Sequence, residues 1–288
     1  MSVTPLTNGA TVLAEPLVDT KRLCLHTITT KPLDLREAVA QYAASGVAGI
    51  SVWREAMEGY TTTEVRTLID DHGLHVVSLV RGGFFVDPTP EGRQAAIDEN
   101  KRIIDQAAAI GAPLVVLVCG AHPEVPLPVA RAQILEGIMA VLPHAVAADV
   151  KLAIEPLHPM YADMRSAVNT LEQANDLALA TNHSHVGVAF DVYHCWWDPQ
   201  LEHEIKRCGA HDKLLAYHVC DWKVPPSDLL LDRGLMGEGC IPLRQIRTWV
   251  EDAGFEGYIE VEIFSNNYWA QDQSSYIQAI RQAYLDHV

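Results

Sequence analysis

Acidic and imidazole side chains stand in four successive apolar segments in the second half of this chain. Glu155 ends "KLAIE", Asp191 ends "HVGVAFD", and His218 lies within "LLAYHV". The next segment, "GYIEVEIF", carries Glu260 and Glu262. Burying an ionised carboxylate costs several kcal/mol unless it is paired or bound to a metal. Four segments that all carry such groups are therefore hard to explain as core filling.

These side chains predict a metal site made of Glu155, Asp191, His218 and Glu262. Three carboxylates and one imidazole suit Mn²⁺, Mg²⁺ or Co²⁺ better than a thiolate-rich zinc site, although Zn²⁺ stays open. We expect one divalent cation, Mn²⁺ before the others. Taken singly, each carboxylate could cap a helix or pair with a base, and His218 could be a core histidine. Glu260 and Glu262 share one face of their strand, so periodicity alone does not choose between them.

The elements that must position these residues are eight short apolar segments, each followed by a longer amphipathic one. Two capping-box patterns, Asp34 with Glu37 and Thr61 with Glu64, mark the starts of helices. Gly111 is a natural helix terminator. The predicted strands begin at Arg22, Gly49, His75, Pro113, Lys151, His185, Leu214 and Gly257.

Apolar strands separated by helices predict a parallel sheet covered by helices. Eight such units in 288 residues suit an α/β fold of one domain, a (β/α)8 TIM barrel. A doubly wound sheet is the rival, but "LHTITTKPLDL" after the first strand lacks the expected GxGxxG. We predict the barrel over residues 22–288, preceded by an N-terminal arm over residues 1–21. The strand ends then meet at one rim, where barrel enzymes carry their active sites.

Composition narrows the classes of function. The formal net charge of −16 argues against nucleic-acid and anionic-membrane partners, which need clustered Lys and Arg. No apolar run reaches the roughly 18 residues of a membrane helix, and the N-terminus lacks a signal-peptide pattern. The six cysteines show no CxxC spacing. We therefore expect reduced thiols and a cytoplasmic protein.

Several motifs resemble those of the xylose isomerase-like barrels, a family of sugar isomerases, ketose 3-epimerases and inosose dehydratases. They are "AIEPLHP", "VAFDVYH", "YHVCDW", "MGEGCIPL" and "GFEGYIEVEIF", in the family's order. The resemblance implies that Glu155, Asp191 and His218 are metal ligands. Its register over the last motif selects Glu262, rather than Glu260, as the fourth ligand.

The resemblance also implies a reaction, namely isomerisation or epimerisation of a carbohydrate or polyol ketone. A divalent cation would acidify the C–H beside a carbonyl and stabilise the resulting enediolate. Glu155 and Glu262 would exchange the roles of proton acceptor and proton donor. His194 and Arg233 would orient substrate oxygens.

The chain departs from the family where epimerases read the sugar. In place of "EPLNRFE" it has His158 and Tyr161 at the sugar-contacting positions. We expect His158, His122 after the fourth strand and Trp197 in "YHCWWDPQ" to contact substrate; Trp197 could instead pack in an interface. These changes leave a lyase as the alternative, either a dehydratase or an enzyme for β-elimination from 3-oxo-glycosides or C-glycosides.

Two further classes fit less well. A DNA-repair endonuclease on this barrel would need a histidine-rich trinuclear zinc site and a basic face, against the charge of −16. A non-catalytic binding barrel would not need four metal ligands. By resemblance we expect a homo-oligomer, with a small accessory subunit if the reaction is C-glycoside cleavage.

Overall fold

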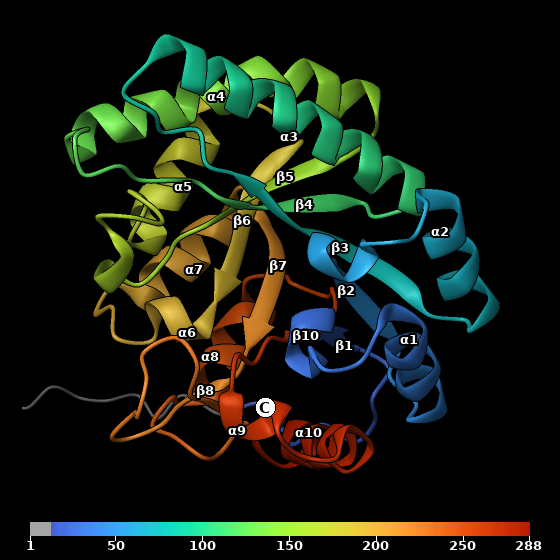
Figure 1. Ribbon diagram of the computed structural model, residues 1–288. Helices are drawn as coiled ribbons and strands as arrows, with labels where there is room; N and C mark the ends of the chain where they lie inside the picture. Colours follow the sequence, from blue (N-terminus) through green and yellow to red (C-terminus); the bar gives the residue numbers. More distant parts are fainter. Residues whose placement is uncertain (1–12) are drawn as a thin grey trace, which may run out of the picture.

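The computed structural model describes residues 13–288 and contains a closed barrel of eight parallel strands (Figure 1). The strands neighbour one another in the order β1, β10, β7, β6, β5, β4, β3, β2, and β2 pairs with β1 to close the ring. This confirms the predicted (β/α)8 TIM barrel. The strands of the barrel are β1 Leu23–His26, β2 Gly49–Trp53, β3 His75–Gly83, β4 Leu114–Val118, β5 Lys151–Glu155, β6 Val186–Asp191, β7 Leu214–Val219 and β10 Ile259–Val261.

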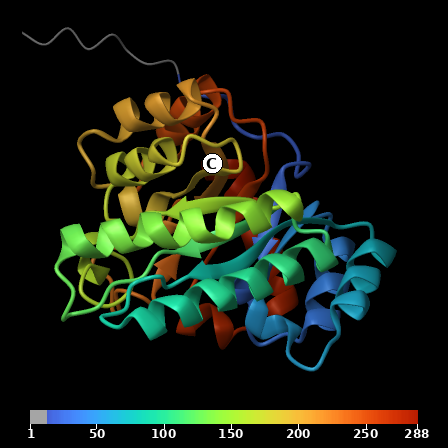
Figure 2. The same cartoon turned by 90° about the horizontal axis from the view of Figure 1, so that it is seen from above.

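Helices form the outer layer, and α3 and α4 lie side by side over the strands (Figure 2). Short 3-10 helices follow β1, β2 and β5 at the strand ends. The α-helices are α1 Leu35–Ala44, α2 Thr62–Asp71, α3 Pro90–Ile110, α4 Leu127–Ala147, α5 Leu171–Ala180, α6 Val192–Cys195, α7 Leu201–Ala210, α8 Leu243–Asp252, α9 Asn266–Trp269 and α10 Gln273–His287. The 3-10 helices are η1 Thr27–Thr30, η2 Arg54–Met57 and η3 Pro159–Tyr161.

The local signals in the sequence act as expected. Both capping boxes form, with Asp34 accepting from the Glu37 N–H at the start of α1 and Thr61 accepting from the Glu64 N–H at the start of α2. Gly111 ends α3 in the left-handed region at φ 79°, which costs glycine little. These three predictions are confirmed.

Small residues line the inside of the barrel on the strands that carry the site. Ala153 on β5, Ala189 on β6 and Ala216 on β7 belong to one buried interior cluster. Glu155, Asp191 and His218 each follow one of these alanines by two residues, so they point to the same inner face. The alanines leave space at the centre of the barrel, which polar side chains then occupy.

The described part of the N-terminal arm has no helix or strand before Leu23. It packs against α8, where the Arg244 guanidinium donates to the Ala14 carbonyl at 2.7 Å and the Ala14 N–H donates to Thr248 at 2.8 Å. The first twelve residues of the predicted arm lie outside the described residues. The boundary at residue 21 stays a prediction.

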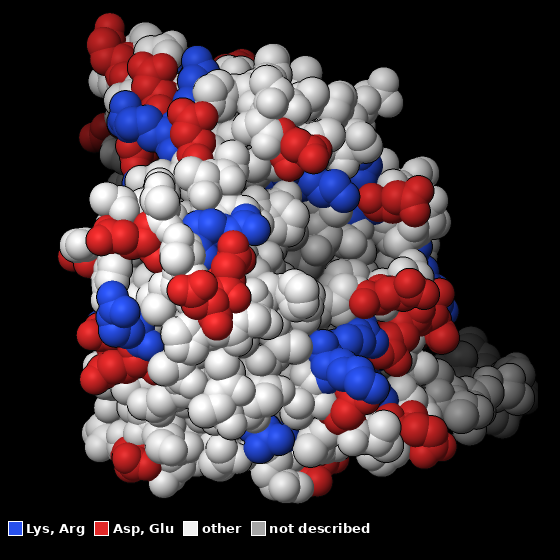
Figure 3. All heavy atoms as spheres, turned by 90° about the vertical axis from the view of Figure 1, so that its right-hand side faces the viewer, with Lys and Arg blue, Asp and Glu red and all other residues white. Residues whose placement is uncertain are grey.

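From the sequence we expected no apolar run as long as a membrane helix, and helix α4 departs from that expectation. By length and hydropathy, α4 alone among the helices of residues 13–288 could span a membrane. Its Ile134, Ile138 and Val141 are buried in the barrel's core, as in a covering helix of a TIM barrel. On the face shown in Figure 3, acidic groups are interspersed with the basic ones, and the basic groups form no continuous stripe.

Candidate metal centre

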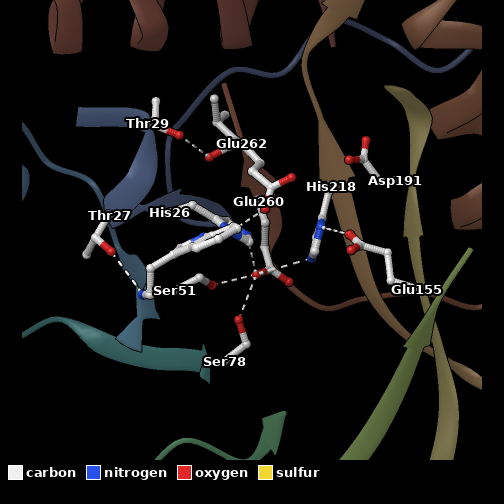
Figure 4. A network of polar contacts seen from close by, with 12 residues as sticks. His26, Thr27, Thr29, Ser51, Ser78, Glu155, Asp191, His218, Glu260 and Glu262 are labelled. Carbon is white, nitrogen blue, oxygen red and sulfur yellow. Dashed lines mark hydrogen bonds and ion pairs between the residues drawn. The ribbon is translucent and has the colours of Figure 1, made fainter. Parts of the chain in front are cut away.

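The four predicted ligands converge at the mouth of the barrel. Glu155 ends β5, Asp191 ends β6, His218 lies near the end of β7, and Glu262 directly follows β10. All four are buried, and one ligand atom from each lies within 4.8 Å of those of the others. We call these four residues the mouth set. Figure 4 shows His218 with Glu155 on one side and Glu260 on the other.

Unsatisfied polar atoms within the mouth set indicate room for a cation. The His218 Nδ1 is 3.3 Å from the Glu155 Oε1, but neither atom has a hydrogen-bond partner in the structure. Buried polar atoms normally find a partner, because leaving one without a partner costs about 1–3 kcal/mol. Carboxylate oxygens and an imidazole nitrogen are ligands of divalent metals. The residues present therefore fit a bound divalent cation.

Arg233 reaches the mouth set from outside the barrel strands. It stands on β9 (Arg233–Gly234), which pairs with β8 (Asp221–Trp222) in a small antiparallel sheet. Its Nη1 is 3.1 Å from the Asp191 Oδ2 and 2.9 Å from the Glu262 Oε2, and the side chain is fully buried. The arginine expected to orient substrate thus also offsets the charge of two predicted ligands.

Asp221 fixes the turn that follows Arg233. Its carboxylate accepts backbone N–H groups from Gly237 at 3.0 Å, Gly239 at 2.9 Å and Ile241 at 3.0 Å. This explains why the "HVCD" and "MGEG" motifs occur together: one supplies the acceptor and the other supplies the N–H donors. The aspartate therefore has a structural role here.

The charges of the mouth set perturb one another without a metal. Burial raises the pKa of Asp191 to about 7, with Arg233 opposing the rise and Glu262 adding to it. Burial would raise the pKa of Glu262, but His26 and Arg233 hold it well below its usual range. Burial lowers the pKa of His218. The negative charges of Glu260 and Glu155 together have the larger effect and raise this pKa to about 10. His218 is therefore protonated at pH 7, and a cation that bound its nitrogen would displace that proton.

A second layer of polar residues lies deeper in the barrel, and we call it the floor: His26, Ser51, Ser78 and Glu260. The Glu260 Oε2 accepts from the Ser51 hydroxyl at 2.5 Å and from the Ser78 hydroxyl at 3.4 Å. The same oxygen is 3.1 Å from the His26 Nε2 and 3.7 Å from the His218 Nε2 (Figure 4). The floor therefore connects β1, β2 and β3 to the imidazole of the mouth set.

His26 joins the floor to the mouth. Its Nδ1 lies 3.1 Å from the Glu262 Oε1, while its Nε2 faces Glu260, and the Trp53 indole N–H donates to Nδ1 at 3.1 Å. His26 lies within "RLCLHTIT", the first predicted strand, and no role was predicted for it. No local signal could show that it lies between two glutamates 234 and 236 residues away.

A cavity of about 20 Å³ lies directly over the mouth set. Of the predicted site residues, Glu155, Glu262, His194 and Arg233 line it. The other lining residues are Trp53, Arg81, Val118, Leu157, Tyr161, Arg165, Leu230 and Phe264. A second cavity of about 440 Å³ shares Trp53, Arg81 and Phe264 with it, so the two adjoin.

Three predicted substrate contacts are not among the residues lining the 20 Å³ cavity. His158 stacks on Trp222 with ring centroids 5.3 Å apart and meets Trp197 edge-on at 5.7 Å. The Trp197 indole donates to the His194 carbonyl at 2.8 Å. His122 accepts the Glu124 N–H at 3.2 Å in the loop before α4. Their contact with substrate stays a prediction.

The structure adds lining residues with no role assigned from the sequence. Trp53 and Arg81 lie on the second and third predicted strands, for which no site residue was predicted, and Tyr161 is one of the departures from the epimerase motif. Arg165 lies in a loop whose path sequence periodicity does not predict, and Phe264 ends the predicted strand "GYIEVEIF" without a polar group that would single it out.

Comparison with known proteins agrees with this geometry. The family model described as "Xylose isomerase-like TIM barrel" matches residues 39–282. The inosose isomerase of Bacillus licheniformis is 25% identical over 252 residues, covering 80% of this chain and 88% of that protein. The crystal structure of protein SMc04130 from Sinorhizobium meliloti 1021 is 44% identical, with TM-score 0.90 over 92% of this chain and 98% of that one. A structure of IOLI protein with a zinc atom has TM-score 0.82 and 21% identity, over 92% and 97% of the two chains.

Proposed function

The chain belongs to the xylose isomerase-like TIM barrel family, and from this premise we propose that it is a divalent-metal-dependent isomerase or epimerase. Its substrate would be a carbohydrate or polyol ketone, which loses and regains a proton beside its carbonyl through an enediolate. The relationship to inosose isomerases supports an enzyme of the sugar isomerase and epimerase type. The metal requirement and the enediolate are the parts that need testing.

One observation carries this proposal, the convergence of Glu155, Asp191, His218 and Glu262 within 4.8 Å. These residues would hold the cation. When bound, the cation would draw electron density from the substrate carbonyl and acidify the adjacent C–H. We propose Mn²⁺ as the resident ion, and Zn²⁺ belongs in the test because the IOLI structure contains it.

Glu155 and Glu262 would carry out the proton transfers. They come from β5 and from the end of β10, and both line the cavity over the mouth set. If one carboxylate removes a proton from one face of the carbon and the other donates to the opposite face, the configuration inverts. If one carboxylate moves the proton between neighbouring carbons, an aldose–ketose isomerisation results.

His194 and Arg233 would orient the substrate oxygens. The His194 Nδ1 is buried without a hydrogen-bond partner, and both residues line the cavity. Burial and the nearby Arg233 guanidinium lower the pKa of His194 well below its usual range, so the ring is neutral at pH 7. A neutral imidazole can donate to, or accept from, a sugar hydroxyl.

The adjoining cavity favours one second candidate, a lyase. Its volume of about 440 Å³ leaves space beside the reacting centre for a leaving group larger than water. Proton removal beside the carbonyl would then be followed by β-elimination.

The test is solvent-proton exchange in D₂O with Mn²⁺-loaded protein, using an inosose, D-fructose and a 3-oxo-glucoside. Deuterium incorporation at the carbon beside the carbonyl, with the glycosidic bond intact, is the expected result for an isomerase or epimerase. Release of the aglycone at a rate matching the exchange would favour the lyase. If the wild-type protein exchanged no substrate proton with any of the metals, and Glu155→Gln behaved as the wild type does, both the isomerase and the lyase proposal would be contradicted.

A further inference from the structure

Two arginines at the barrel mouth line the cavity, and among residues 13–288 no carboxylate accepts a hydrogen bond from either of them. Arg81 stands near the end of β3, and Arg165 lies in the loop between η3 and α5. Both line the 20 Å³ cavity together with Glu155 and Glu262. They approach it from the third and the fifth strand–loop units.

Aromatic rings hold both guanidinium groups. The Arg81 Cζ is 5.5 Å from the ring centroid of Trp53 and 5.3 Å from that of Phe84. The Arg165 Cζ is 5.3 Å from the ring centroid of Tyr161. Rings can hold a guanidinium in place while its N–H donors stay available to a further acceptor.

Those donors are unused within the described residues 13–288. Neither guanidinium donates a hydrogen bond there, and the one carboxylate within ion-pair distance is Glu55, which is 4.0 Å from Arg81 and 58% exposed. Arg233, by contrast, contacts two carboxylates at about 3 Å. The three mouth arginines therefore differ: one is neutralised within the protein, and two are available to a ligand.

Charge balance does not account for the two free arginines. Glu155, Asp191, Glu262 and Glu260 bring four carboxylates to the centre of the barrel. Arg233 and a divalent cation would already offset three of these charges, and the fourth, on Glu260, accepts hydrogen bonds from the Ser51 and Ser78 hydroxyls. Two guanidinium groups facing one small cavity then attract an anion.

We infer that Arg81 and Arg165 bind an oxyanion of the substrate, which makes the substrate a keto sugar or polyol ketone bearing a carboxylate or phosphate group. This inference rests on the proposed function for the reacting centre. Arg81 also lines the adjoining cavities of about 440 and 560 Å³, so the charged group can lie beside the reacting carbons while the rest of the molecule extends outward.

The experiment is isothermal titration of the full chain, loaded with Mn²⁺, with D-fructose, D-fructose 6-phosphate and 5-keto-D-gluconate. These probes separate a neutral sugar, a phosphate and a carboxylate. We expect at least one anionic probe to bind tenfold or more tightly than D-fructose. Arg81→Gln and Arg165→Gln should each remove most of that advantage and leave D-fructose binding within about twofold.

Arg66→Gln is the matched control, because Arg66 is paired with Asp70 on the outer helix α2. It should change no probe's affinity, and thermal melting should show all three variants folded. Equal losses for neutral and anionic probes would overturn the inference, since the arginines would then contact hydroxyl groups. A tenfold change in Mn²⁺ affinity in Arg81→Gln or Arg165→Gln would also overturn it, by assigning them to the charge balance of the metal site.

Failure of the proposed function would be visible separately. If the wild-type protein binds no Mn²⁺, the same probes are titrated into metal-free protein. If this metal-free protein preferred an anionic probe, and lost the preference in the Arg81 and Arg165 variants, the oxyanion subsite would be supported and the metal-dependent function would not. The lack of any preference, with metal binding intact, would overturn the subsite alone.

Discussion

Glu260 on β10 and Glu262 directly after it lie two residues apart and point to the same side, yet their surroundings differ. Glu260 belongs to the floor, where two serine hydroxyls and His26 contact a single carboxylate oxygen. Glu262 belongs to the mouth set, where its neighbours are charged groups and the 20 Å³ cavity. Two residues advance a strand by about 7 Å, which moves a side chain from a closed layer to an open one.

The comparison teaches how to separate a supporting carboxylate from a ligand. In the floor, the Ser51 and Ser78 hydroxyls donate hydrogen bonds to Glu260, as expected for a buried group that positions others. In the mouth set, the Glu155 Oε1 and the His218 Nδ1 have no hydrogen-bond partner. Burial alone does not distinguish the layers, because all of these residues are buried. The two layers are distinguished by which of their polar atoms have a hydrogen-bond partner and which have none.

The largest expected effect is on turnover. Glu262→Gln and Glu155→Gln should each lower kcat by about 10³-fold or more, because each removes a group that would accept or donate the proton. Steady-state kinetics at saturating Mn²⁺ measures this effect, and Glu172→Gln on the surface of α5 is the control. If Glu260→Gln lowered kcat at saturating metal as much as Glu262→Gln does, the separation of the two layers would be wrong.

The second largest effect should come from removing the metal bound by the mouth set. Chelation should abolish activity, and Mn²⁺ at about 100 times its Kd should restore it and stabilise the fold by about 2.7 kcal/mol. Thermal unfolding with and without Mn²⁺ measures the stabilisation. Asp191→Asn should lose most of it, because it removes a charged ligand. The same stabilisation in wild type and Asp191→Asn would contradict the ligand assignment.

Glu260→Gln should act on metal affinity. Loss of the carboxylate beside the His218 Nε2 should weaken Mn²⁺ binding by about 10–100-fold, as seen when groups supporting metal ligands are changed. Excess Mn²⁺ should then restore kcat, which distinguishes a positioning residue from a catalytic one. Calorimetric titration with Mn²⁺ gives the affinity. If the Mn²⁺ affinity of Glu260→Gln were unchanged, Glu260 would not position the metal ligands and would only pack in the floor.

The smallest effect should separate the two serines of the floor. Ser51→Ala removes the short hydrogen bond to Glu260 and should cost about 2 kcal/mol of unfolding free energy, within the range for bonds to charged groups. Ser78→Ala removes a 3.4 Å contact and should cost less than about 1 kcal/mol. Urea denaturation of both variants provides the comparison. Equal costs would indicate that cavity formation, and not the hydrogen bonds, sets the stability there.

Much of the fold could be predicted from the sequence, because strand and helix periods, capping boxes and helix terminators are local signals. All eight predicted strands occur, each starting within two residues of its expected position. Glu155, Asp191 and His218 could also be named, because strand ends in a barrel meet at one rim, whereas the choice of Glu262 over Glu260 came from the family resemblance. The loop contacts could not be predicted: Arg233 pairs with Asp191 across 42 residues through β8 and β9.

By itself, the sequence determined which residue types stand at the strand ends and on which face of each strand they point. Only the tertiary structure decided their depth, because depth depends on the stagger between neighbouring strands as the barrel closes. That stagger placed Glu260 against two serines and Glu262 beneath the cavity. Tertiary contacts also decided which arginine is neutralised and which two face the cavity, since Arg233 on β9, Arg81 on β3 and Arg165 in a loop are far apart in the sequence.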